Sequence, residues 1–135
     1  MKNNFTTFVQ SKRLIELGVP VDSADCVGYI VDKSIDMCSE YFQKGETRIT
    51  VINPRHTYTQ VTTLKYGEKW LDEPFPCWSV GRLIEIYNTC IDSDKDEIKI
   101  PKEHFILTRV LIEFFAALEY GWLDFTKLDD KLWLG

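Results

Sequence analysis

The apolar stripe of residues 103–120 constrains the fold more than any other feature, because a long amphipathic helix must bury its apolar side. Arg109 and Glu113 fall outside the stripe, and Gly121 follows it as a glycine able to end the helix in a left-handed conformation. The stripe consists of Leu107, Leu111, Phe114, Phe115, Leu118 and Trp122. We therefore expect a helix here that contributes a large part of the core.

Two further helices are predicted from their start and stop signals. Thr7 and Gln10 form a capping box for a helix over residues 7–17, and Gly18 marks its end. Ser79 caps another helix, in which apolar residues keep a spacing near 3.6. Those residues are Val80, Leu83, Ile84, Tyr87 and Ile91.

The middle of the chain favours strands. Residues 26–31 and 47–52 are rich in β-branched and apolar side chains, and 57–65 is dense in Thr, Tyr and Val. We expect 47–52 and 57–65 to pair as a hairpin around the turn at 53–56. Residues 34–42 fit either a helix or a strand, 70–76 reads as an irregular crossing, and 97–100 is a possible edge strand.

These elements predict one α+β domain over residues 1–135, with three amphipathic helices packed on an antiparallel β-sheet of three to five strands. The formal charge is −5, from 16 Lys+Arg against 21 Asp+Glu, and the basic residues are dispersed. Because binding of extended nucleic acid needs clustered cations, that role is disfavoured. No apolar run predicts a signal peptide or a membrane span, so we expect a cytoplasmic protein with free thiols at its four cysteines.

The polar residues form no recognisable catalytic or metal-binding motif. The two histidines, His56 and His104, lie far apart, and no zinc-like spacing of Cys and His occurs. A cysteine-dependent hydrolase would pair Cys77 or Cys38 with one of these histidines, but no local motif supports it. We therefore expect no enzyme activity, no metal and no cofactor.

The start of the helix after Ser79 is one candidate ligand site. Helix N-termini favour anions, and Gly81 would allow a close approach. Arg82 could bind a phosphate and Trp78 could stack on a base. The alternative is structural, with Ser79 as an ordinary cap and Trp78 as an apolar residue packed on the core.

A second candidate surface consists of the polar side chains at the predicted hairpin, which suit an anion or a protein partner. Its residues are Arg48, Arg55, His56 and Tyr58. The alternative there is a solvated turn. The apolar tail residues Leu132, Trp133 and Leu134 either dock on the chain's own sheet or form a subunit interface.

Three segments together resemble a known family. They read QSKRLIELGVPVDSAD (10–25), PCWSVGRLIE (76–85) and FFAALEYGWL (114–123), and they resemble small uncharacterised proteins carried by phages and mobile elements of gut anaerobic bacteria. The resemblance implies a non-enzymatic binder, in its sharpest form a homo-oligomeric anti-defence sponge that sequesters a host nucleotide signal. A second hypothesis is a protein–protein inhibitor or adaptor that acts through the predicted hairpin and the apolar tail.

Overall fold

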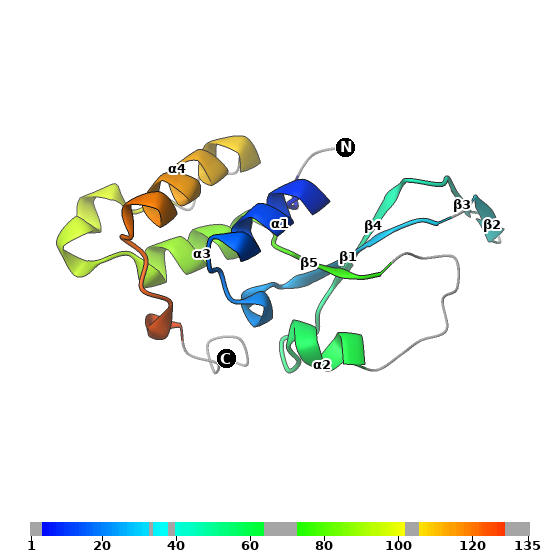
Figure 1. Ribbon diagram of the computed structural model, residues 1–135, viewed down its shortest axis with the longest axis horizontal. Helices are drawn as coiled ribbons and strands as arrows, with labels where there is room; N and C mark the ends of the chain where they lie inside the picture. The colour runs from blue at the N-terminus through cyan, green and yellow to red at the C-terminus, as the bar shows by residue number, and fades with distance from the viewer. Residues whose placement is uncertain (1–3, 33, 38–39, 64–72, 102–105, 129–135) are drawn as a thin grey trace.

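The computed structural model describes residues 4–32, 34–37, 40–63, 73–101 and 106–128 and has an α+β architecture (Figure 1). The three longer helices, α1, α3 and α4, lie together at one end of the molecule, and the strands extend away from them. The helices are α1 (Phe8–Glu16), α2 (Tyr58–Thr63), α3 (Val80–Cys90) and α4 (Leu107–Tyr120). The strands are β1 (Cys26–Ile30), β2 (Ile35–Met37), β3 (Glu40–Phe42), β4 (Thr47–Val51) and β5 (Phe75–Cys77). Short 3₁₀ turns are η1 (Val21–Ser23), η2 (Ser93–Ile98) and η3 (Phe125–Lys127).

Local capping signals correctly predicted both ends of α1, the start of α3 and the end of α4, whereas α4 begins at Leu107 and not at the predicted 103. The Thr7 hydroxyl accepts a hydrogen bond from the Gln10 amide at 3.2 Å, and the Gln10 side chain accepts from the Thr7 amide at 3.0 Å. Gly18 follows α1 with φ +101°, and Gly121 ends α4 with φ +72°. Glycine adopts these positive φ angles without the steric cost that a side chain would add.

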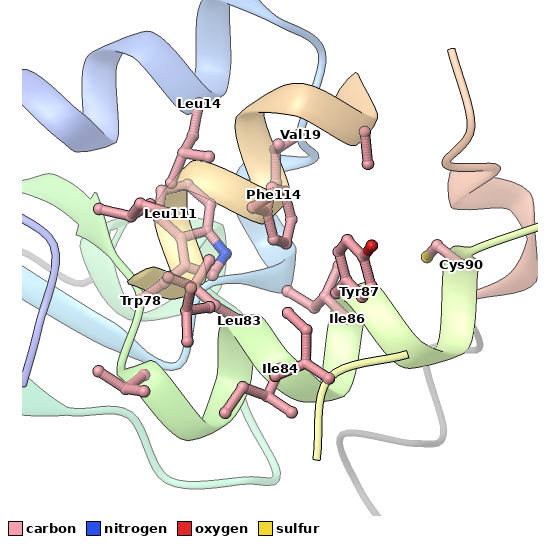
Figure 2. Close-up of a cluster of buried hydrophobic side chains, with 14 of the residues drawn as sticks. Leu14, Val19, Trp78, Leu83, Ile84, Ile86, Tyr87, Cys90, Leu111 and Phe114 are labelled. Carbon is pink, nitrogen blue, oxygen red and sulfur yellow. The ribbon is translucent and has the colours of Figure 1, made fainter. Parts of the chain in front are cut away.

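The main core lies between α1, α3 and α4. Leu14 of α1 and Phe114 of α4 are fully buried, and Figure 2 shows both directed towards Trp78, which precedes α3. On α3, the buried side chains of Leu83 and Ile86 complete this cluster. The apolar stripe of α4 is therefore buried as predicted, against two other helices and the indole ring of Trp78.

The three-stranded sheet has the order β4-β1-β5, with both pairs antiparallel. The irregular crossing expected at 70–76 is wrong at its end, because Phe75 and Pro76 belong to β5. The Phe75 ring lies over Gly28 of β1, so closely that a Cβ on Gly28 would sit 2.3 Å from Phe75 Cζ. Phe8 of α1 meets the same ring edge-on, with centroids 5.3 Å apart. This contact joins the helices to the sheet.

Strands β1 and β4 continue into the short hairpin β2–β3, so residues 35–37 and 40–42 of the ambiguous segment are strands. Ile35 opposite Phe42 lies four positions beyond Val31 opposite Glu46, so the pairing resumes in the same register. Gly45, with φ +89°, lies in the turn just before β4 and donates to Val31 O at 2.8 Å. We call β1, β2, β3 and β4 together the β-arm. In Figure 1 its distal hairpin lies at the opposite end of the molecule from α3 and α4.

The hairpin predicted between 47–52 and 57–65 is wrong. Residues 47–51 pair with β1 instead, and residues 58–63 form α2. Two polar interactions overcome the β preference of this Thr-rich segment. Thr57 and Gln60 form a second capping box, with bonds of 2.9 and 3.2 Å. Asp22 accepts two more bonds from Thr59, from its amide at 2.9 Å and its hydroxyl at 2.6 Å.

The edge strand considered at 97–100 is also not formed. Residues 93–98 are the 3₁₀ turn η2, and the backbone of Ile100 bonds a side chain in place of a strand. The Asn88 amide donates to Ile100 O and accepts from Ile100 N, both at 2.8 Å. A side-chain amide offers a donor and an acceptor together, so it replaces one residue of a β partner.

Candidate functional site

The first candidate ligand site, at the start of α3, is already filled by a carboxylate of the chain itself. The Ser79 amide and hydroxyl donate to the two Asp25 carboxylate oxygens, at 2.9 and 2.5 Å. Ser79 Oγ in turn accepts from the Arg82 amide at 3.1 Å. Because Asp25 carries the negative charge that a helix N-terminus favours, an external anion would have to displace it or sit beside it. The structural alternative describes Ser79 correctly.

Trp78 is not available to stack on a nucleotide base, so that expectation is wrong. Its side chain is 0% exposed, and its Nε1 donates to Ser23 Oγ at 3.1 Å. A Trp before a helix cap packs on the core when an apolar groove and a polar partner for the indole N–H both exist. Here α1 and α4 supply the groove, through Leu14 and Phe114 (Figure 2). Ser23 of η1 supplies the hydroxyl.

Arg82 is likewise committed inside the fold, which contradicts its predicted role as a phosphate ligand. The residue is 6% exposed, its Nε donates to Ser23 O at 2.8 Å, and its guanidinium pairs with Glu85 Oε1 at 2.5 Å. Gly81 lies on the exposed side of α3 with open space around it. The residues predicted to bind a ligand here therefore connect α3 to the turn at 20–25.

The second candidate surface is divided over three elements. Arg48 lies on β4 opposite Tyr29, and Tyr58 lies on α2. Burial, followed by the negative charges of Tyr29 and Glu73, raises the pKa of Tyr58 to about 12. Tyr58 is therefore a neutral phenol at physiological pH, packed near the same side of the sheet as Arg48.

Arg55 and His56 occupy the exposed turn between β4 and α2. Asn53 organises this turn, because its side chain accepts from the Arg55 amide at 2.9 Å and its carbonyl accepts from the His56 amide at 2.8 Å. Such an Asx turn is an ordinary loop structure. The four predicted residues thus come from a strand, a turn and a helix, with Arg48 on β4, Arg55 and His56 in the turn, and Tyr58 on α2.

The described cysteines are buried free thiols. Cys26, Cys77 and Cys90 are each 0% exposed. Burial is the main cause that raises the pKa of Cys77 to about 12 and that of Cys90 to about 11, and it raises the pKa of Cys26 as well. A nucleophilic cysteine needs thiolate character and access, so these three thiols are unsuited to catalysis. Cys38 and His104 lie outside the described residues.

The remaining predictions concern metal ligands, the apolar tail and membrane spans. Within the described ranges, no group of three or more His, Cys, Asp or Glu side chains is arranged to hold a metal ion. Leu132, Trp133 and Leu134 lie outside the described residues. Among the helices that the structure describes, none has the length and apolarity needed to cross a membrane.

Sequence reasoning missed the surface that the fold makes most prominent, the β-arm. Tyr41 on β3 is 58% exposed and Val51 on β4 is 67% exposed, both unusual for large side chains on strands of a small protein. The sequence signal was present in the alternation of 47–52. It was misassigned because that segment was paired with its neighbour along the chain and not with β1.

Two hydrogen bonds at the ends of the β1–β4 ladder determine which backbone groups of β4 point towards its outer edge. Val31 N–H donates to Glu46 O at 2.8 Å, and Ile52 N–H donates to Asp25 O at 2.9 Å. Bonded and non-bonded pairs alternate along an antiparallel ladder. The register from Cys26 opposite Val51 to Ile30 opposite Thr47 is unbroken between these bonds.

The alternation assigns a direction to each backbone group of β4. Arg48 and Thr50 direct their N–H and C=O groups towards β1, while Thr47, Ile49 and Val51 direct theirs away from it. Because β4 is an edge strand of the described sheet, those outward groups form a row along its free side. Such a row is a template for pairing with another strand.

Comparison with protein-family models, with curated proteins and with solved structures found no match to this chain.

Proposed function

We propose that this chain is a non-enzymatic binding protein that holds another polypeptide through its β-arm. The single observation that carries the proposal is the arm itself, a long hairpin whose distal part, β2–β3, lies away from the main helical core (Figure 1). The two side chains of this part whose burial is described, Asp36 and Tyr41, are both exposed, and an exposed aromatic side chain on a strand is a common feature of binding surfaces. A binding role would account for it.

The polar groups of the helical body support holding over chemistry. Asp25, Ser79 and Arg82 bond one another or the backbone in a network that joins η1 to α3. Within the described residues, every buried polar side-chain atom has a hydrogen-bond partner. A reacting group needs a position from which it can leave such bonds and meet a substrate. The network instead rigidifies the body from which the arm extends.

Tyr41 is the residue of the arm best suited to contact a partner. It lies opposite Asp36 in the distal hairpin, and 58% of it is exposed. Tyrosine is enriched at the energetic centres of protein interfaces, because it combines a rigid apolar ring with a hydroxyl group. In the setting that the family resemblance implies, the partner would be a host protein, and the chain would act as its inhibitor or as an adaptor.

The test compares two tyrosines that are both largely exposed. Tyr120 at the end of α4 is 69% exposed and stacks on Trp122 with ring centroids 4.8 Å apart, so it serves as the control on the helical body. Wild type, Tyr41→Ala and Tyr120→Ala are immobilised, and proteins retained from a lysate of the natural host are quantified by mass spectrometry. We expect a defined partner that Tyr41→Ala loses at least about tenfold and Tyr120→Ala retains.

Two results would contradict the proposal. One is a set of retained proteins that is the same for wild type and Tyr41→Ala, or that is lost equally with Tyr120→Ala. The other is release of a stoichiometric nucleotide when protein purified from its host is denatured, which would restore the hypothesis of sequestration of a small anionic signal.

A further inference from the structure

We infer that the outer edge of β4 pairs antiparallel with β4 of a second copy of this chain, with the twofold axis passing between the two Ile49 residues. The product would be a homodimer in which the three-stranded sheets of two copies join into one. The inference concerns the proximal part of the β-arm and does not depend on the partner proposed for Tyr41. It rests on the direction of the backbone groups, the composition of the strand and the choice of register.

The two edges of the sheet differ in how they are protected. The edge formed by β5 is three residues long, carries Pro76 and packs against α1 through Phe75. Cys77 and Phe75 bond β1, so the position without an N–H, Pro76, faces outward. These are the devices by which proteins prevent an edge from pairing.

The edge formed by β4 has none of these devices among its own residues. Its sequence, TRITV, contains no Pro, Gly or Lys, and four of its five residues are β-branched. Val51 is 67% exposed, and Ile49 is only partly buried. A strand of this composition is suited to lie between two others. Addition of a second β4 would cover both side chains and use the outward row of N–H and C=O groups.

The register of the proposed β4–β4 pairing follows from the length of β4 and from its one charged residue, Arg48. A twofold axis at Ile49 pairs all five residues, with Thr47 opposite Val51 of the second copy and Arg48 opposite Thr50. In this register the outward groups of Thr47, Ile49 and Val51 meet one another, as bonded pairs require. A twofold axis at position 48 would instead place two Arg48 side chains directly opposite each other, which like charges disfavour. Of these two registers, strand length and charge both favour the one centred on Ile49.

The first experiment measures self-association of the full chain by sedimentation velocity between about 10 µM and 1 mM, because an interface below standard size is weak. Val51→Pro removes an outward N–H and leaves the ladder to β1 intact, and Val51→Ala is its matched control. We expect wild type and Val51→Ala both to dimerise, with Val51→Ala somewhat weaker because it lacks the apolar side chain that pairing covers. Val51→Pro should raise the dimer dissociation constant at least about tenfold, because the twofold interface loses one hydrogen bond from each copy.

The second experiment tests the register without a proline. Ile49→Cys and Thr50→Cys are each made in a Cys38→Ser background, since the other three thiols are buried. Opposed Cα atoms of a bonded pair lie about 5.5 Å apart, within reach of a disulfide. Under mild oxidation Ile49→Cys should form a covalent dimer at least about tenfold faster than Thr50→Cys, which sits opposite Arg48 of the second copy.

Three results would overturn the inference. They are a wild-type chain that stays monomeric up to about 1 mM, a Val51→Pro variant that is folded and dimerises as well as Val51→Ala, and a Thr50→Cys variant that cross-links as fast as Ile49→Cys. Loss of the Tyr41-dependent partner with the dimer intact would leave this inference standing, so the two proposals fail separately.

Discussion

Replacement of Asp25 by alanine should destabilise the protein severely, because this carboxylate connects η1 to the start of α3. It accepts the Ser79 amide and hydroxyl at 2.9 and 2.5 Å in a partly buried position. Hydrogen bonds to charged groups contribute about 1.5–3 kcal/mol each. A carboxylate at a helix N-terminus adds about 0.3–1 kcal/mol. We therefore expect Asp25→Ala to lose about 3–7 kcal/mol, a large part of the total for a domain whose stability is about 5–15 kcal/mol.

Asp22 provides a matched control, because it also accepts one amide and one hydroxyl at a helix start. Its partner is Thr59 of α2, and the site is exposed. We expect Asp22→Ala to cost about 1 kcal/mol, as for an ordinary cap. Urea unfolding followed by circular dichroism should show a midpoint lowered by about 2 M for Asp25→Ala and by about 0.5 M for Asp22→Ala. Equal losses, or a smaller loss for Asp25→Ala, would refute the reasoning that burial of the carboxylate makes this cap stronger.

Three further predictions follow from the packing. Gly28→Ala should cost about 1–3 kcal/mol, because its Cβ would meet the Phe75 ring at 2.3 Å, whereas Gly81→Ala, in open space on α3, should be neutral or stabilising in thermal unfolding. Burial raises the pKa of Cys77 from 9.0 to about 12 in the folded state, so the unfolded thiol loses its proton first as the pH rises. The contribution of Cys77 should therefore lower the free energy of unfolding by about 1.4 kcal/mol per pH unit between pH 9 and 12. Cys77→Ala should flatten that alkaline slope, and an unchanged slope would contradict the assignment. Arg82→Met should lose about 1–3 kcal/mol in urea unfolding by leaving a buried carbonyl without its donor, and no loss would show that this guanidinium is dispensable.

The helices could be predicted because their signals are local. The side chains of Thr7 and Ser79 and the glycines at 18 and 121 act within one turn of each end, and the structure has all of them in these roles. The same logic could have identified α2. Its Thr57 and Gln60 repeat the Thr–x–x–Gln pattern of α1, but the density of Thr, Tyr and Val suggested a strand. A capping box was therefore a better guide than composition.

Strand partners could not be predicted in the same way, because pairing depends on distant residues. Segment 47–51 alternates as a strand should, but its partner is β1 and not the next segment along the chain. The short β5 was missed because Pro76 argues against a strand. It forms because the two flanking residues bond β1 while the proline faces outward.

The candidate site at α3 was misread for a related reason. Ser, Gly, Arg and Trp at a helix start suit an anion when they are exposed, and sequence alone does not show exposure. Ser23 and Asp25, more than fifty residues earlier in the chain, bind Trp78, Ser79 and Arg82. Once those contacts exist, the group is structural. These contacts join segment 10–25 to segment 76–85. We therefore interpret the residues that make them as a requirement of the fold.

Residue-resolved amide hydrogen exchange of β4 tests most directly the claim that the outer edge of the β-arm pairs with a second copy of the chain. Arg48 and Thr50 donate towards β1 and should be protected at every concentration. Thr47, Ile49 and Val51 face outward, and their protection should rise with protein concentration as copies pair. Protection of these three amides that does not change between about 10 µM and 1 mM, whether absent or complete, would contradict the account.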